Sequence, residues 1–386
     1  MIGSLVTAWV LGLIAAAEAA VPEVRVLDGP EVQPMLDALK RVGSPARRVT
    51  RLDRAALAPP CVLVLCGKAP PAGAAEAKLV RTFLEAGGVV LGVGGGATWM
   101  IEHKLFDAKG YYPSGTTIHM SGFHGYHRLT FGYPGATPEE DGINGIPMLL
   151  RATEGPLLEL GPRPSSVLGA GGPYSLAALE RVGKGLALLI GPDPQGGNAY
   201  HSLDKPTPTP GDKLKTDRLL ANAIAFLQDP GGNLIPNSGF EENTSLPPQQ
   251  SHWQLELRQS ATSTWCTQDA PEGRVFLRIA CPARSSGSVR PFCPIVVQRG
   301  STCRLACLYR ATAPWTLEVR FLHGAADALK PQDAPAVRVS ESGSWKRTES
   351  LLVIPADVAY VGLAATLRGP GELSLDEFTL RLAQPE

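Results

Sequence analysis

Residues 84–99 read LEAGGVVLGVGGGATW, and this stretch decides the fold of the first half of the chain. Gly87 and Gly88 end a run with helical spacing, because glycine favours the conformation that closes a helix at its C-terminus. The run Val89–Val93 has the length and apolar character of a buried strand. The glycines at 94–96 then allow a tight turn into a second helix. A helix, a buried strand and another helix in succession predict an α/β fold.

The same alternation of apolar runs and helical patterns extends from about residue 24 to residue 227. It predicts a mostly parallel sheet covered by helices, in an α/β domain over residues 21–228. Between about Gly110 and Gly172 the helical period is lost, and Gly and Pro turns separate short strand-like pieces. We therefore expect an inserted or peripheral β region there.

The second half of the chain has a different rhythm. Asp229-Pro-Gly-Gly232 ends the last helical pattern, and after it short runs of period two are separated by turn residues every eight to twelve positions. A stretch of about 150 residues with this pattern has the size of one β-sandwich. We assign the sandwich to residues 233–386.

The first twenty residues differ from the rest. Residues 5–17 are almost all apolar, over about half the length that a membrane span needs, and Ala17-Glu18-Ala19 has the small-x-small form of a cleavage site. We expect residues 1–20 to be a signal peptide and the protein to be secreted or periplasmic. The alternatives are an uncleaved anchor and a buried first strand. No membrane span is expected after cleavage.

Charge and cysteine content restrict the partners and the disulfides. Lys plus Arg and Asp plus Glu number 36 each, so no long-range field attracts a polyanion, and nucleic acid is not an expected partner. The chain has 7 Cys, an odd number. Cys303 and Cys307 lie four residues apart on an expected strand, about 13 Å, which is beyond disulfide reach. One or two cross-strand disulfides remain open among Cys266, Cys281, Cys293 and this pair.

Three motifs of the first half resemble class I glutamine amidotransferase-like domains. They are residues 84–99, the strand and loop GKGLALLIGPDPQ at 183–195, and the helix LLANAIAFL at 219–227. The resemblance implies a flavodoxin-like α/β fold for most of residues 22–228. It also implies where a nucleophile, a base and an orienting carboxylate would lie.

At these three positions the sequence departs from the family. The chemistry needs a Cys thiolate, a His that takes its proton and a carboxylate that orients the His. The positions fall on Gly94, Asp193 and Gln195. Because all three groups are missing in matched contexts, we expect amidotransferase chemistry to be absent.

One alternative assigns a catalytic role to a histidine-containing loop. The sequence HMSGFHGYH contains His119, His124 and His127. These residues, with His103, His201 and Asp193, are candidates for a metal site or for acid–base catalysis in a hydrolase. Their spacing matches no metal-ligand motif, and a hydrogen-bonded structural role is the simpler interpretation. Convergence of two of these histidines beside the Gly94 turn would favour an enzyme.

The second half resembles CenC-type carbohydrate-binding modules of the family 4/9 group. The resemblance rests on the opening NLIPNSGFE at 233–241 and on the closing motifs GSWKRT at 343–348, LLVIP at 351–355 and GELSLDEFTL at 371–380. It covers about residues 233–383. It implies a galactose-binding-like jelly-roll sandwich, whose partner would be a polysaccharide or another glycan.

Sugar recognition needs flat aromatic faces bordered by hydrogen-bonding groups. The candidates are Trp253, Trp265, Tyr309 and Trp315, of which Trp265 and Trp315 are preferred because Thr, Ser or Pro residues surround them. Trp345 matches a structural Trp of the family and is assigned to the core.

The family resemblance also implies a structural Ca²⁺ ion, with Glu241 and Asp376 at the matching positions. Two carboxylates supply only part of the six to eight oxygens that Ca²⁺ prefers. The preferred function is an exported, non-catalytic binding protein that engages a glycan. The alternatives are the hydrolase above and a scaffold, within an envelope complex, for a protein partner.

Overall fold

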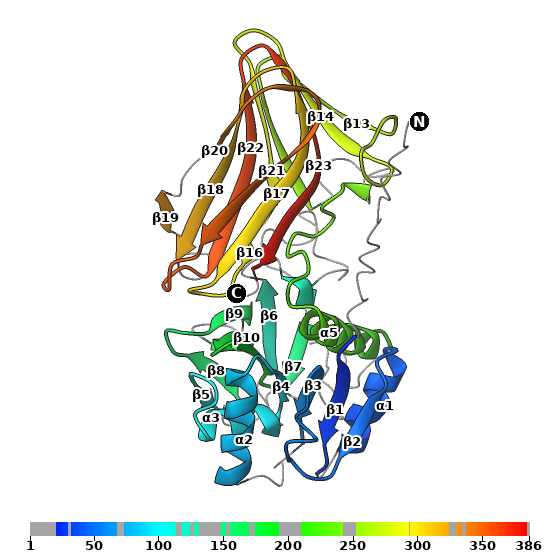
Figure 1. Cartoon of the computed structure of the whole chain (residues 1–386), viewed down its shortest axis with the longest axis vertical. Helices are drawn as coiled ribbons and strands as arrows, with labels where there is room; N and C mark the ends of the chain where they lie inside the picture. The colour runs from blue at the N-terminus through cyan, green and yellow to red at the C-terminus, as the bar shows by residue number, and fades with distance from the viewer. Residues whose placement is uncertain are drawn as a thin grey trace, which may run out of the picture.

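The computed structural model has an α/β domain at one end and a β-sandwich at the other (Figure 1). The first domain draws its strands from residues 23–190, and the sandwich draws its strands from residues 253–382. The structure describes residues 21–29, 32–67, 73–112, 118–123, 127–130, 148–151, 155–169, 174–192, 210–241, 252–292, 294–323, 330–333 and 337–383.

The α/β domain is built on five parallel strands. They are β1 (Glu23–Leu27), β2 (Ala46–Val49), β3 (Cys61–Leu65), β4 (Val89–Val93) and β11 (Gly185–Ile190). Their order in the sheet is β2-β1-β3-β4-β11. Every residue of β3 and β11 is buried, as expected for parallel strands that are covered on both faces.

Helices cover both faces of this sheet. Helices α1 (Val32–Arg41) and α5 (Pro210–Gln228) pack into one apolar cluster, and α2 (Ala74–Glu85) and α3 (Gly95–Glu102) pack into another (Figure 1). On the first face, the Arg41 guanidinium joins α1 to α5 by pairing with both carboxylate oxygens of Asp217, at 3.0 Å each. The expected parallel strands covered by helices are therefore present, but the complete eleven-stranded sheet is mixed and not mostly parallel.

An antiparallel extension continues the sheet beyond β11. Its elements are β5 (Ala108–Tyr111), β6 (Ile118–Phe123), the short helix η1 (Arg128–Thr130), β7 (Met148–Arg151), β8 (Leu157–Leu160), β9 (Ser165–Gly169) and β10 (Tyr174–Val182). Strand β10 pairs with β11, and β9, β6 and β7 follow in that order, while β8 joins β5 to β10. This extension contains the β region predicted between residues 110 and 172.

The second half folds into two facing sheets. One contains β12 (Trp253–Arg258), β15 (Ser286–Pro291), β16 (Ile295–Val296), β18 (Trp315–His323), β19 (Lys330–Asp333), β20 (Val337–Val339) and β22 (Tyr360–Arg368). The other contains β13 (Thr262–Cys266), β14 (Phe276–Cys281), β17 (Thr302–Ala311), β21 (Ser342–Val353) and β23 (Gly371–Leu382). Along β22 buried residues alternate with partly exposed ones, so one face packs on the core and the other faces outward. The expected β-sandwich is present.

The two domains touch through buried groups. The Ser165 hydroxyl on β9 donates a 2.8 Å hydrogen bond to the carbonyl of Val297, which follows β16 in the sandwich. The Arg299 guanidinium donates to the Pro162 carbonyl at 2.8 Å. One apolar cluster includes residues of both domains. The domains therefore share part of their core.

Two further features concern the whole described chain. Among the described cysteines, residues 61, 66, 266, 281, 303 and 307 are free thiols, so none of the cross-strand disulfides left open by the sequence forms between them. Cys293 lies outside the described residues. No helix in the described ranges combines the length and the apolar character required to cross a membrane.

Candidate functional site

The Gly94 turn joins β4 directly to α3. Gly94 has φ 57° and ψ −117°, a conformation that glycine adopts far more easily than other residues. It is buried, and its N–H donates to the Ile190 carbonyl at 3.0 Å. The turn has the strand–turn–helix form that can expose a nucleophile, but this residue has no side chain.

Backbone from two other segments closes over this turn. A Cβ atom added to Gly155 would lie 1.8 Å from the Gly191 carbonyl oxygen and 2.9 Å from the Gly94 Cα atom. Such distances leave no room for a side chain between the three segments. Asp193 and Gln195 lie outside the described residues. The described part of the turn is therefore tightly packed.

The histidines of the hydrolase alternative occupy several different environments. His127 is buried against the Phe226 ring of α5, with ring centroids 4.7 Å apart, and its Nδ1 atom accepts the Leu129 N–H at 3.2 Å. Burial, with a smaller contribution from the Arg128 charge, lowers the pKa of His127 to about 3. The imidazole is therefore neutral at physiological pH. His119 lies on β6, whereas His124 and His201 lie outside the described residues.

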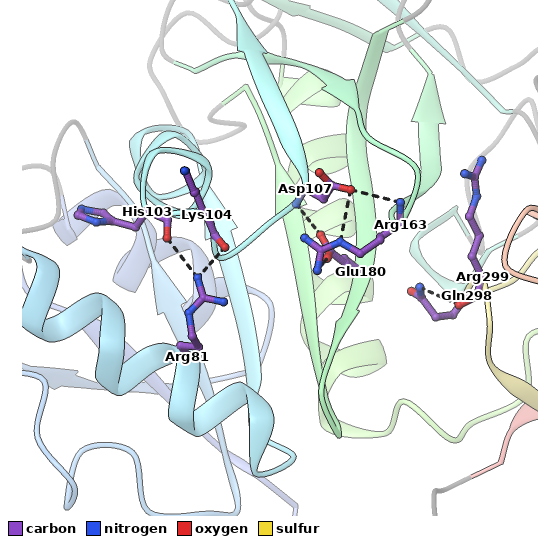
Figure 2. Close-up of polar contacts among 8 residues, drawn as sticks. All are labelled: Arg81, His103, Lys104, Asp107, Arg163, Glu180, Gln298 and Arg299. Carbon is purple, nitrogen blue, oxygen red and sulfur yellow. Dashed lines mark hydrogen bonds and ion pairs between the residues drawn. The ribbon is translucent and has the colours of Figure 1, made fainter.

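His103 lies away from His127. It follows α3, on the opposite face of the sheet from α5, and its ring packs against Trp99. Figure 2 shows that the backbone carbonyls of His103 and Lys104 accept hydrogen bonds from Arg81. The two histidines whose side chains are described therefore do not converge on the Gly94 turn.

The most buried carboxylate of the α/β domain, Glu180 on β10, has a structural partner on each side. Its side chain is completely buried, its Oε1 atom lies 3.1 Å from the Arg163 guanidinium, and the Asp107 N–H donates to Oε2 at 2.6 Å (Figure 2). Burial raises the pKa of Glu180, while the Asp107 N–H and the Arg163 charge lower it. This cluster holds the turn between β8 and β9 against β10, next to the Pro162 carbonyl that Arg299 binds.

The four aromatic residues proposed for sugar stacking lie in or against the core of the sandwich. Trp253, Trp315 and Tyr309 are exposed by only 1%, 2% and 5%. Trp265 is half-buried and packs on Phe240, with centroids 5.3 Å apart. Stacking on a pyranose needs a ring face open to solvent. This placement differs from the expectation, because the polar neighbours in the sequence occupy the outward-facing positions of the same strands.

A groove of about 690 Å³ lies on the outward face of the seven-stranded sheet. Its floor is formed by small residues on the two neighbouring strands β15 and β22: Ser288, Thr366, Ala364 and Gly362. The residues between them, such as Val289 and Ala365, are buried in the core. Small residues on two adjacent strands thus create a depression along the sheet.

Charged side chains on both sides of the floor line the groove. On one side, the guanidinium of Arg290 lies 3.0 Å from the Glu256 carboxylate. On the other side, Glu318 is shared by Arg320 at 3.5 Å and Arg368 at 3.9 Å. The groove therefore offers many hydrogen-bond donors and a small number of acceptors that already have partners.

This groove was not predicted from the sequence. Its floor consists of short side chains in the segments SGSVR (286–290) and GLAATLR (362–368). Small outward-facing residues at alternate positions of a strand are a usable signal. They form a groove only because strand pairing places Ser288 beside Thr366 and Glu318 beside Ala364. This pairing cannot be read from either segment alone.

The two residues proposed for Ca²⁺ lie close together beside the five-stranded sheet, with Asp376 on β23 and Glu241 in the segment before β12. The side chain of Asp376 on β23 is fully buried. A Cβ atom on Gly239 would lie 3.6 Å from its Oδ1 atom and 3.8 Å from Cγ of Glu241. Burial raises the pKa of Asp376 to about 7, and the negative charges of Glu241 and Glu377 add to this effect.

The pair supplies oxygen atoms of the kind that a hard cation prefers, but backbone N–H groups and the Arg274 guanidinium already contact these oxygens. A cation would remove the repulsion between Glu241 and Asp376 and favour the ionised form of Asp376. Backbone N–H groups of Arg274 and Val275 donate to one oxygen of Glu241, at 2.6 and 3.0 Å. Among the described residues, no group of three or more His, Cys, Asp and Glu side chains surrounds a metal position. Backbone carbonyls would have to supply the remaining ligands.

Comparisons with known proteins give structural similarities only. No family model and no curated protein matches the chain. The enzymatically active domain of tailspike protein 4 of bacteriophage CBA120 is 12% identical at a TM-score of 0.34, and the match covers 39% of this chain and 21% of the tailspike chain. TmCBM61 in complex with β-1,4-galactotriose is 15% identical at a TM-score of 0.30, covering 39% of this chain and 99% of that one.

A further solved structure is similar over the same share of the chain. The CBM22-1 xylan-binding domain of Xyn10C from Paenibacillus barcinonensis is 15% identical at a TM-score of 0.27, and the match covers 39% of this chain and 94% of that domain. Carbohydrate-binding modules are thus among the structures to which this chain is similar.

Proposed function

We propose that the protein is an exported, non-catalytic binding protein that holds a glycan chain in the groove of the seven-stranded sheet. The observation that carries the proposal is the groove itself, with a volume of about 690 Å³, a floor of small residues and polar walls. Ligand sites in proteins are typically concave and about 300–1,000 Å³ in volume. The resemblance of residues 233–383 to CenC-type modules supports the same ligand class.

The chemistry of the groove suits a polyhydroxylated ligand. Ser288 and Thr366 face each other on adjacent strands and carry hydroxyl groups that donate and accept. The arginines around them donate, and Glu256 and Glu318 accept. Sugar hydroxyls need both kinds of partner, because a hydroxyl buried without a hydrogen bond costs free energy.

For the α/β domain we propose a supporting role without amidotransferase chemistry. The order β2-β1-β3-β4-β11 corresponds to the 2-1-3-4-5 order of flavodoxin-like sheets, which supports the proposed relationship to amidotransferase-like domains. The packing of Gly155 and Gly191 around Gly94 supports the absence of a nucleophile site. Buried contacts to the sandwich make this domain a rigid base for the groove.

Three further parts of the proposal rest on sequence. Export rests on the apolar residues 5–17 and the Ala17-Glu18-Ala19 site. The jelly-roll class of the sandwich rests on the CenC-type resemblance, and the repeated crossing of the chain between the two sheets agrees with it. A structural Ca²⁺ ion at Glu241 and Asp376 rests on the same resemblance, supported by the burial of Asp376 and by its repulsion from the partly exposed Glu241.

The test is binding of the full chain to an array of neutral and acidic polysaccharides. We expect at least one to bind, and Ala364→Trp to weaken that binding about tenfold or more, because an indole at this position fills the floor of the groove. The matched control is Thr264→Trp, at an exposed position of the opposite sheet, which should leave binding unchanged. Failure of every glycan to bind would favour the alternative of a scaffold for a protein partner.

A further inference from the structure

The groove carries more positive than negative charge. Its described charged residues are the arginines at 258, 290, 320 and 368 and the glutamates at 256 and 318, a net charge of +2. The whole chain has a net charge of zero. Since charges are screened beyond about 10 Å in 0.1 M salt, this local excess acts on a ligand in the groove and has little effect at long range.

Two of the arginines form a clamp across the floor. Arg258 pairs with Ser286, and Ser286 pairs with Arg368, so the three residues form one row across the strands β12, β15 and β22. With about 4.8 Å between neighbouring strands, the two arginine Cα atoms are about 10 Å apart. Two long guanidinium side chains at this separation can both reach an anion placed above the Ser286 hydroxyl.

Within the described part of the chain, Arg258 has no charged partner and Arg368 has only a long contact with Glu318. In the described part of the chain, Arg258 is exposed and forms no ion pair or side-chain hydrogen bond. The Arg368 side chain is 81% exposed, and its one carboxylate neighbour, Glu318 at 3.9 Å, also lies 3.5 Å from Arg320. Neither guanidinium is therefore neutralised by a carboxylate of its own.

A second basic position lies further along the groove. Arg290 follows Ser286 by four residues on β15, which places it about 14 Å from the clamp row at about 3.4 Å per residue. Its guanidinium pairs with Glu256 at 3.0 Å and is 44% exposed. Its charge is shared with Glu256, so Arg290 offers a ligand further hydrogen-bond donors but less free positive charge than the clamp row.

The groove has little aromatic surface. Among its described lining residues, Phe292 is the only aromatic one, and it is half-buried near the end of the floor. Neutral polysaccharides offer ring faces for stacking and hydroxyls for hydrogen bonds. Arginine, in contrast, binds carboxylate and sulfate groups through two parallel hydrogen bonds. The chemistry of the walls therefore favours anionic substituents over bare sugar faces.

We propose that the groove binds an anionic glycan, with a carboxylate or sulfate group held between Arg258 and Arg368. This inference rests on the proposed glycan-binding function and specifies the ligand class of the same site. The anion accepts hydrogen bonds from the two guanidiniums and from the Ser286 hydroxyl, while Ser288 and Thr366 bind hydroxyls of the next sugar.

The test compares two forms of one polymer, polygalacturonate and its fully methyl-esterified derivative, by titration calorimetry with the full chain. The backbone is the same, and only the charge differs. We expect the acidic form to bind at least about tenfold more tightly, since a charge-assisted hydrogen bond contributes roughly that factor. Its affinity should fall when the salt concentration is raised from 0.05 to 0.5 M, whereas a neutral ligand would show little change.

The variant is the double substitution Arg258→Gln and Arg368→Gln. Both side chains are exposed, so folding should be retained, and a thermal melt checks this. We expect the preference for the acidic polymer to be lost, while Arg278→Gln, an exposed arginine on the opposite sheet, keeps it. A variant that retains the full preference would contradict the proposal.

The remaining outcomes separate this inference from the proposed function. Equal binding of both polymers would overturn the anionic ligand class and leave glycan binding intact. Binding of neither these polymers nor any array glycan would overturn both. A parallel titration with chondroitin sulfate and its desulfated form distinguishes sulfate from carboxylate. Equally tight binding of single-stranded DNA would show a general affinity for polyanions and overturn the glycan assignment.

Discussion

The Gly94 turn lies at the end of a strand in the α/β domain, and the groove lies on the face of a sheet in the sandwich. Both are positions where proteins bind ligands, but the two regions are built in opposite ways. At Gly94, backbone from Gly155 and Gly191 packs so closely that no side chain fits at position 155. In the groove, small side chains on β15 and β22 leave the space open. Glycine closes the first region by allowing segments to approach, whereas short side chains open the second. Small residues alone therefore do not indicate a site.

The largest expected effect tests the closure of the Gly94 turn. Gly155→Ala places a Cβ atom 1.8 Å from the Gly191 carbonyl oxygen, so backbone must move. We expect a loss of about 3 kcal/mol or more in the free energy of unfolding, at the upper end of overpacking effects. Chemical denaturation measures it. The control is Gly343→Ala, where the added atom meets nothing within 4 Å, and we expect a change of less than about 0.5 kcal/mol. Equal stability of both variants would show that the turn has room for a side chain.

The next prediction concerns the sheet opposite the groove. If Ca²⁺ binds at Glu241 and Asp376, a hundredfold excess over its dissociation constant should stabilise the protein by about 2.7 kcal/mol relative to chelator. The Asp376→Asn variant should lose this difference. Equal melting temperatures of the unmutated protein in calcium and in chelator would remove the ion from the proposal.

Because the pKa of Asp376 is raised, the stabilisation by Ca²⁺ should also depend on pH. Because the folded-state pKa is raised from 3.8 to about 7, the folded protein holds a proton that the unfolded chain has lost. In chelator, the contribution of Asp376 to stability is present below about pH 4 and is lost as the pH rises to about 7. Ca²⁺ favours the ionised carboxylate and should reduce this loss. The comparison with Asp376→Asn isolates the effect.

A smaller effect tests the structural role of His127. Its pKa is lowered from 6.5 to about 3, so the unfolded chain binds a proton between these values and the folded protein does not. Stability should therefore fall as the pH decreases through this window. Between pH 7 and pH 5 we expect the stability difference between the unmutated protein and His127→Gln to shrink by about 2 kcal/mol. An unchanged difference would mean that His127 is accessible to protons in the fold, as the hydrolase alternative requires.

The sequence predicted the strands and helices better than it predicted which residues are exposed or line a groove. The stretch 84–99 gave a correct strand, turn and helix, because a fully apolar run and a glycine turn depend on local chemistry. The period-two runs indicated the sandwich for the same reason. Closure of the Gly94 turn depends on Gly155, some sixty residues away, and no local pattern indicates it.

The burial of the aromatic candidates could not be predicted from the sequence for a related reason. The polar neighbours of Trp315 suggested an exposed ring, but in a strand the neighbours point to the opposite face from the residue itself. Polar flanking residues are therefore compatible with a buried Trp315, exposed by only 2%. The groove combines residues of β12, β15, β18 and β22, so it follows from strand pairing and not from any one segment.

The smallest expected effect tests whether the α/β domain, which contains the Gly94 turn, and the sandwich, which contains the groove, unfold together in one cooperative transition. Ser165→Ala removes the buried hydrogen bond to the Val297 carbonyl between the domains and should cost about 1 kcal/mol. Ser166→Ala is the matched control, since its hydroxyl contacts Ser175 within the α/β domain at 2.6 Å.

Two spectroscopic probes follow the two domains separately. Circular dichroism at 222 nm follows the described helices, which lie in the α/β domain. Tryptophan fluorescence mainly follows the sandwich, which contains four of the six Trp residues. If the shared core couples the domains, both variants lower the transition seen by both probes. If the domains unfold separately, Ser166→Ala shifts only the helix signal and Ser165→Ala shifts neither, and the α/β domain is then no rigid base for the groove.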